Sequence, residues 1–513
     1  MLTTLNILTI GLYFSIILGV SVWSSRLSKT GDDFLMAGRN LSWPIVGASL
    51  FMSNVSSSTL VGLMGAAYAY GIAVAAYEWM AILVLCIGAL WVYPKYVQLK
   101  VTTVPEFLET HYNYSARLYF AVLTLFLTIV VDMAVSLYAG ALTLHTFIPD
   151  FKISTMVYCL ATFAGIYTIM GGLRAVVYTD AIQGVFLIFG VILLTLLIFK
   201  DYGFSFSKLH SSLPQGYLSM IRPIHDPMMP WQGIILGVSS MGFWYWCTNQ
   251  YVVQRAMAAK TTHDATKGAF FAAILKYIPI FFMILPGVMA LSLFPGLDNG
   301  DKIFAVLIKN YIPDGLSGLM IAALMAGIMS SVDSALHSSA TIIVKDILPH
   351  FYQPKLSGEA MLKLCRVVMI GVVIFAALWS PYIAKFDGVF HYIQQVYGFL
   401  VPPVAIVFLF RIFSNFGKRS SAIWTFTLTN ALGLILFYFV IIKESLLTDI
   451  HYSLVTSLIV VLSVIIYVLV SLLNKSQESI PTCDLSPVTQ KRWEMKMFYG
   501  LITSVALMII ILR

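Results

Sequence analysis

About fourteen predominantly apolar runs recur along this chain, each close to the roughly 20 residues that a helix needs to cross a lipid bilayer. Hydrophobic residues make up 59% of the 513 positions and charged residues only 11%, whereas soluble domains are roughly 45–50% apolar. The pattern therefore predicts an all-α integral membrane protein with a single transmembrane domain over residues 1–513. The runs begin near Thr4, Trp43, Ile72, Arg117, Ile153, Thr179, Pro230, Gly268, Leu316, Met361, Gly388, Ser421, Tyr452 and Met495.

The basic residues indicate how the chain is oriented. With the amino terminus outside, most of the 31 Lys and Arg residues, Arg255 among them, fall in loops on the inner side, as the positive-inside rule requires. The net charge of +8 is spread over many short loops, so no nucleic-acid partner is expected. We expect a multi-pass protein of the plasma membrane or the bacterial inner membrane, with the lipid bilayer as its partner.

The chain lacks the sequence signatures of an enzyme. It has no Gly-rich phosphate loop, nucleophile elbow or metalloprotease helix. Its cysteines are scattered without paired spacing, which indicates neither a disulfide framework nor a zinc site. They are Cys86, Cys159, Cys247, Cys365 and Cys483.

Two apolar runs are interrupted by residues that compete for backbone hydrogen bonds. The first is broken by Ser53, Asn54 and residues 56–59, and the second, five spans later, by Ser239, Ser240 and Gly242. Corresponding interrupted helices indicate inverted repeats with a binding site between them, as in transporters. On this basis the repeats cover residues 43–200 and 230–411. A leading helix and inner loop (1–42) and three trailing helices (412–513) lie outside them.

One apolar helix, residues 325–342, carries an unusual set of polar groups. Hydroxyl and carbonyl oxygens are ligands for small cations, and a carboxylate within a span is costly without a function. A second acid, Asp180, lies in another apolar run. The alternative is that the serines are small residues for close helix packing. The polar set consists of Gly327, Ser330, Ser331, Asp333 and Ser334.

A further set of polar side chains within the spans is typical of a sugar site, since amide, carboxylate and ammonium groups each bond hydroxyls and an aromatic face covers the ring. For Glu78, an interfacial position beside aromatic belt residues is the alternative. For Lys276, it is snorkelling to the inner surface, and an ion pair between the two also stays open. The set is Asn54, Glu78, Lys276 and Gln394, with Tyr245 and Trp246 as the aromatic face.

Asp132 is an acid within a span that these interpretations leave unassigned. It would repel an anionic solute such as a sialic acid and attract an organic amine. Packing through a neighbouring hydroxyl is the structural alternative.

Several ordered motifs resemble the sodium/solute symporter family over nearly the whole chain, and within it the sodium/glucose cotransporter branch. They are SLFMSNVSSSTLVGLMG, YEWMA, GGLRAVVYTDAIQ, WYWCTNQYVVQR followed by AAK, LKYIPIFFMILPG, MSSVDSALHSSATI, and YIQ before Pro402 and Pro403. The resemblance implies a leucine-transporter-like fold of two inverted five-helix repeats, with alternating access driven by sodium.

The resemblance also implies ion ligands. One shared sodium site falls on the carbonyls of Met52, Val55 and Gly327 and the hydroxyls of Ser330 and Ser331. A second site, present in some members, matches Asp180, Ser330, Asp333 and Ser334. Asp333 departs from the hydroxyl usual at that position. The resemblance therefore allows one sodium ion, two sodium ions, or one sodium ion with a proton at the second site.

For the solute, Asn54, Glu78, Lys276 and Gln394 match the sugar ligands of the branch, and Tyr245 matches its inner aromatic gate. Thr59 and Gly242 depart from the branch and would change which hydroxyls are bound. The expected function is sodium-coupled symport of a neutral glucose- or galactose-like hexose into the cell. The alternatives are sodium- or proton-coupled symport of an inositol, an organic amine or a sialic acid, a passive channel, and a membrane-embedded sensor.

Overall fold

The computed structural model describes residues 4–25, 31–226, 229–313, 316–351, 358–386, 388–443, 450–474 and 491–512. Within these ranges the chain is helical and has only two isolated β-bridges, Leu41–Ala259 and Arg222–Pro230, which agrees with the predicted all-α class. The described cysteines are free thiols, and Cys483 lies outside the described residues.

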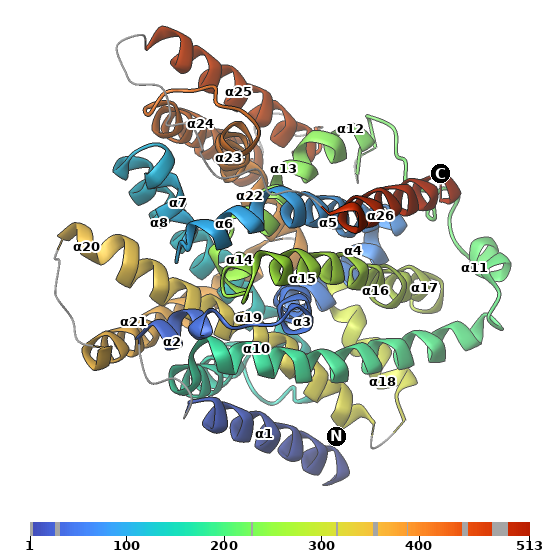
Figure 1. Cartoon of the computed structure of the whole chain (residues 1–513). Helices are drawn as coiled ribbons and strands as arrows, with labels where there is room; N and C mark the ends of the chain where they lie inside the picture. Colours follow the sequence, from blue (N-terminus) through green and yellow to red (C-terminus); the bar gives the residue numbers. More distant parts are fainter. Residues whose placement is uncertain are drawn as a thin grey trace.

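The α-helices pack together in one bundle (Figure 1). They are α1 (Thr4–Ser25), α2 (Gly31–Met36), α3 (Trp43–Asn54), α4 (Ser57–Tyr70), α5 (Ala76–Ile87), α6 (Tyr93–Leu99), α7 (Val104–His111), α8 (Tyr114–Leu127), α9 (Ala134–Phe147), α10 (Ile153–Asp201), α11 (Phe206–Ser212), α12 (Trp231–Gly233), α13 (Ser239–Phe243), α14 (Gln250–Met257), α15 (Thr262–Leu275), α16 (Tyr277–Pro279), α17 (Leu285–Leu293), α18 (Ile303–Tyr311), α19 (Ser317–Ile342), α20 (Leu348–Phe351), α21 (Gly358–Trp379), α22 (Val389–Leu400), α23 (Pro402–Phe413), α24 (Ser421–Phe437), α25 (Tyr452–Leu473) and α26 (Arg492–Ile511).

Short π and 3-10 turns join many of these helices. The π turns are η3 (Gly88–Val92), η4 (Thr128–Met133), η5 (Ile234–Val238), η6 (Trp244–Thr248), η7 (Ile280–Ile284), η9 (Ile343–Ile347) and η11 (Tyr438–Ile442). The 3-10 turns are η1 (Ala37–Arg39), η2 (Ile72–Ala75), η8 (Gly300–Lys302) and η10 (Ser380–Lys385).

Not every predicted span is one long helix. In the described residues, nine helical segments are long and apolar enough to cross a membrane, and two bent pairs, α3–α4 (54°) and α22–α23 (55°), raise the number to eleven. Two further apolar helices, Thr4–Val20 and Ile153–Ile166, are shorter. The run from Pro230 is divided among several short pieces, because its backbone changes between α and π geometry.

The broken helix α3–α4 lies in the interior of the bundle. α3 packs against α15 and α10, and α10 runs along α19, while α1 and the pair α24–α25 occupy opposite edges (Figure 1). The contact between α3 and α15 is close, because a Cβ added at Gly47 would lie 2.6 Å from Gly268 O. Glycine pairs permit this approach of two backbones inside a membrane, and the approach places the break of α3–α4 next to α15 and α19.

Candidate functional site

The break between α3 and α4 frees backbone oxygens inside the bundle. α3 ends at Asn54, and Val55 leaves helical geometry with ψ 75°. The Ser56 N–H bonds to Asn54 O (2.9 Å) and the Thr59 N–H bonds to Ser56 Oγ (3.0 Å). These two donors therefore do not close helical bonds to the carbonyls of Met52 and Val55, and an exposed carbonyl in a bundle interior needs another partner.

The second interruption does not lie where it was predicted. Ser239 and Ser240 belong to α13, because their hydroxyls bond back to Ile234 O (3.2 Å) and Gly237 O (2.8 Å) and leave the helix intact. The chain instead breaks at Asn249, whose ψ is 117°.

The π turn η6 immediately precedes this break. π turns are rare and occur often at functional sites. This one holds Tyr245 and Trp246, and the Asn249 side chain accepts the Tyr251 N–H (3.2 Å) to begin α14. The break thus places two aromatic residues opposite the break of α3–α4.

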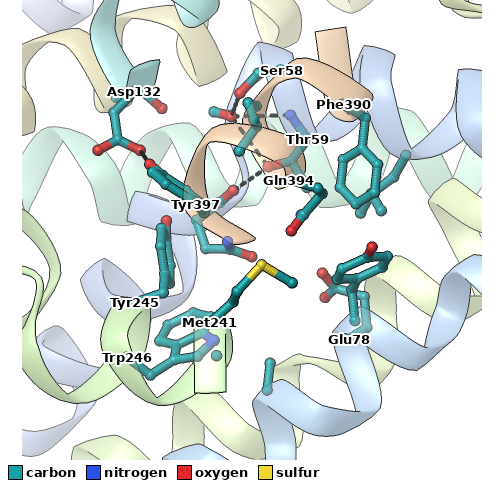
Figure 2. A pocket seen from close by; sticks show the side chains of 18 of the residues that line it. Ser58, Thr59, Glu78, Asp132, Met241, Tyr245, Trp246, Phe390, Gln394 and Tyr397 are labelled. Carbon is teal, nitrogen blue, oxygen red and sulfur yellow. Dashed lines mark hydrogen bonds between the residues drawn. The ribbon is translucent and has the colours of Figure 1, made fainter. Parts of the chain in front are cut away.

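A small cavity, with about 110 Å³ of space open to a water-sized sphere, lies between the two breaks. All of the residues predicted to bind solute line it together (Figure 2). They are Asn54, Thr59, Glu78, Tyr245, Trp246, Lys276 and Gln394. Gly242 lines the cavity too. A Cβ added at Gly242 would have only Val84 within 4 Å, so there is space for a side chain at this position.

The cavity has lining residues that were not predicted as solute ligands. Phe390 and Tyr397 share the cavity face of α22 with Gln394 at spacings of four and three residues, and Asp132 and Ser136 share a face four residues apart. This helical spacing is the sequence pattern from which these additional lining residues could have been predicted. The others include Tyr77, Met241 and Tyr251.

Lys276 forms the polar centre of one side of the cavity. It is fully buried, pairs with the Glu78 carboxylate and donates to Asn54 Oδ1, and its ammonium lies 5.1 Å from the centre of the Trp246 ring. Glu78 is only 4% exposed. Snorkelling of Lys276 and an interfacial position for Glu78 are therefore both wrong, and the ion pair is the correct alternative.

Aromatic groups form two parts of the cavity wall. The hydroxyls of Tyr245 and Tyr251 bond each other, and Tyr251 also donates to Ser53 O (2.9 Å) at the end of α3. Elsewhere on the wall, Phe390 packs edge-on against Tyr77, with ring centres 4.9 Å apart. These rings cover part of the wall, and the Glu78–Lys276 pair in the same cavity is buried, which strengthens the attraction between its two charges.

Asp180 lies outside this cavity, in a buried cluster with Arg255. The two form an ion pair of 3.3 Å, and Ser49 Oγ donates to Asp180 (2.7 Å) while accepting from Arg255 Nε (2.7 Å). Ser330 donates to the other Asp180 oxygen (2.5 Å), and Arg255 donates to Ser334. The placement of Arg255 in an inner loop is therefore wrong, because a buried acid on a different helix pairs with it.

Asp333 belongs to the same region. It is fully buried, and its Oδ1 lies 3.2 Å from Ser334 Oγ. The fold thus brings together all four residues predicted for a second ion, but a guanidinium already compensates the Asp180 charge in this arrangement.

The residues predicted for the shared ion site also converge. Ser330 Oγ lies 3.4 Å from Met52 O, and Ser331 Oγ donates to Gly327 O (3.2 Å) one turn away on α19. Met52 lies in the last turn of α3, and Val55 follows the end of this helix, in the break of α3–α4. Ser331 lines the solute cavity as well, so this residue lies next to both the predicted ion site and the solute cavity.

The chain is similar to known proteins in sequence and in fold. Residues 34–428 match the sodium:solute symporter family. The chain is 32% identical to sodium/glucose cotransporter 4 of Danio rerio, covering 91% of this chain and 78% of that one. It is 34% identical to sodium/myo-inositol cotransporter 2 of Oryctolagus cuniculus, covering 84% and 69%. A solved Na+-coupled sialic acid symporter has the same fold, with a TM-score of 0.80 at 23% identity over 93% of this chain and 100% of that one.

Proposed function

Because this chain belongs to the sodium:solute symporter family, we propose that it imports a neutral glucose- or galactose-like hexose by sodium-coupled symport. It is a multi-pass membrane transporter with a leucine-transporter-like fold and not an enzyme. The observation that carries the proposal is the cavity in which every predicted solute-binding residue meets.

The chemistry of the cavity suits a polyol. The Gln394 amide and the Thr59 hydroxyl line it beside the buried Glu78–Lys276 pair, and each of these groups bonds hydroxyls as donor, acceptor or both. Trp246 presents an aromatic ring to the cavity (Figure 2), 5.1 Å from the Lys276 ammonium, and such a ring suits the apolar face of a pyranose.

Sodium would bind in the break of α3–α4 against α19. The carbonyls of Met52, Val55 and Gly327, with the hydroxyls of Ser330 and Ser331, form an oxygen-only donor set that suits a small hard cation. An ion there would tie α3 to α19 and fix the Ser331 hydroxyl beside the solute. Solute affinity then rises with sodium, and sodium affinity rises with solute by the same factor. When sodium dissociates at the inner side, the solute affinity falls, and the solute is released as well.

We propose a single coupling ion at this site. A second ion at Asp180, Ser330, Asp333 and Ser334 would have to displace the guanidinium of Arg255, which is charged and hydrogen-bonded to this cluster. Displacing a buried ion-pair partner is costly.

An inositol is the second candidate solute, because a cyclitol presents a ring of hydroxyls to the same cavity and a relative named as an inositol cotransporter is 34% identical. The test is uptake of labelled glucose, galactose and myo-inositol by proteoliposomes with an inward sodium gradient, a proton gradient or neither. Accumulation above the outside concentration only with sodium is expected. Accumulation driven by protons, or mere equilibration, would overturn the proposal.

A further inference from the structure

The cavity holds a second carboxylate that no cation neutralises. Glu78 is paired with Lys276, whereas Asp132 occurs in none of the ion pairs within the described part of the chain. Asp132 lines the cavity across from Glu78 (Figure 2). If both acids are ionised, this group of three charges carries a net charge of −1, and the excess lies at the Asp132 end.

Only one oxygen of Asp132 is satisfied. Oδ1 accepts the Tyr397 hydroxyl, while Oδ2 is buried and has no hydrogen-bond partner among the described residues, although the Asn249 side chain lies close enough to interact with the carboxylate. A buried polar atom without a partner is costly. It is therefore expected where a ligand supplies the missing donor.

The backbone holds Asp132 in this position by a π turn. Asp132 lies in η4, between α8 and α9, and π turns are common at functional sites. The Ser136 hydroxyl donates to Asp132 O (2.8 Å), and the Tyr392 hydroxyl donates to Val130 O (3.3 Å). These bonds satisfy carbonyls of the turn and leave the carboxylate free to face the cavity.

The helix α22 contributes residues to the cavity both beside Asp132 and one turn away from it. Its Tyr397 bonds Asp132, and its Gln394 lies on the same face, one turn earlier. A solute that spans the space between Lys276 and Asp132 would therefore contact three elements at once.

We propose that Asp132 is a specificity-determining residue whose free oxygen accepts a hydrogen bond from the solute, and that it makes the cavity favour neutral and amino-substituted polyols over sugar acids. This inference rests on the proposed function, because it assigns a second contact to the same solute. An ammonium in place of one hydroxyl would form a charge-assisted bond with Oδ2, whereas a carboxylate would meet a like charge.

The test is competition against sodium-driven uptake of labelled glucose by glucosamine and by glucuronate, at neutral pH, where most of the glucosamine amine is still protonated and the Asp132 carboxyl is less protonated than at acidic pH. The protein as it stands should be inhibited at least as well by glucosamine as by unlabelled glucose, and poorly by glucuronate. Asp132→Asn should weaken inhibition by glucosamine about 10-fold or more relative to glucose, and should narrow the gap between glucosamine and glucuronate.

Tyr392→Phe is the matched control. It removes a buried hydroxyl bond from the same helix to the same π turn, but Tyr392 does not line the cavity. It should leave the order of the three competitors unchanged. Equal ratios among the competitors in Asp132→Asn and the unaltered protein would overturn the inference.

A second readout needs neither a variant nor transport. Thermal stabilisation of the purified protein should be larger with glucosamine than with glucuronate. Equal stabilisation by the two would overturn the role of Asp132. Absence of labelled glucose uptake would instead count against the hexose symport function, so the two failures are distinguishable.

Discussion

The guanidinium of Arg255 lies 3.3 Å from the carboxylate of Asp180, and both side chains are fully buried. Arg255 lies in the last turn of α14, whereas Asp180 lies in α10, so the pair joins two elements far apart in sequence. Removing one partner of such a pair leaves a buried charge uncompensated, which typically costs about 3–5 kcal/mol.

Arg255→Gln should therefore lower the free energy of unfolding by about 3–5 kcal/mol. Because the change also frees Asp180 as a cation ligand, sodium should restore stability in this variant more than in the unaltered protein. Thermal unfolding in sodium and in choline chloride measures both effects. The double variant Asp180→Asn with Arg255→Gln removes both charges and should lose the extra sodium response; an equal response in all three proteins would contradict the account.

Variants of the Glu78–Lys276 pair distinguish its contribution to stability from its contribution to solute binding. Lys276→Met leaves Glu78 buried without its partner, so we expect a loss of about 3–5 kcal/mol together with loss of uptake. Adding Glu78→Gln should recover most of the stability without recovering uptake, since the solute contacts stay absent. Melting temperature and labelled glucose uptake of the single and double variants check this, and uptake by the double variant at the original rate would refute the assignment.

The close contact between α3 and α15 predicts a local steric effect. An added methyl at Gly47 would lie 2.6 Å from Gly268 O and 2.7 Å from the Phe271 ring. Gly47→Ala should cost about 1–3 kcal/mol, the usual range for overpacking. Gly371→Ala is the control, because nothing lies within 4 Å of its added Cβ. Equal melting temperatures of the two variants would show that α3 and α15 are farther apart.

Asp301, in the connection between α17 and α18, should make stability depend on pH. Burial raises the pKa of Asp301 to about 6, although the hydrogen bond from the Val389 N–H lowers it in part. Its pKa in an unfolded chain is about 3.9. Between these values the native state binds more protons than the unfolded state, so the free energy of unfolding falls as pH rises from about 4 to about 6 and then levels off.

Asp301→Asn keeps an acceptor for Val389 and removes the titration. The stability of the unaltered protein minus that of the variant should therefore fall by about 2 kcal/mol between pH 4 and pH 7, because each pKa unit of the shift contributes about 1.4 kcal/mol and the unfolded carboxyl is already half ionised at pH 4. Thermal unfolding over this pH range measures the difference. A difference that stays constant, or rises with pH, would disprove the effect of Asp301.

The solute cavity was predictable because its main residues are polar groups in apolar runs, where each is conspicuous. Asn54, Glu78, Lys276 and Gln394 come from separate helices, and the structure brings them to one cavity. The apolar periodicity likewise indicated the helical membrane fold. The extents of the two repeats, residues 43–200 and 230–411, stay a prediction.

The features that were missed depend on contacts between distant segments. Arg255 stands near the end of an apolar run, where a loop position is the ordinary interpretation, and only the position of α10 reveals its partner. The break at Asn249 was missed for a related reason: the serines of α13 resemble helix breakers, but their hydroxyls bond within the helix. Local sequence does not record which hydrogen-bond partner a serine uses.

The central claim is that sodium and solute are coupled through Ser331, which belongs to the proposed sodium site and lines the solute cavity. The most direct measurement is the glucose dissociation constant of the purified protein as a function of sodium concentration, for the unaltered protein and for Ser331→Ala. We predict that sodium lowers the dissociation constant about 5-fold to 150-fold in the unaltered protein, the usual extent of coupling between sites, and far less in Ser331→Ala. A glucose affinity that does not change with sodium, or an equal sodium effect in both proteins, would contradict the account.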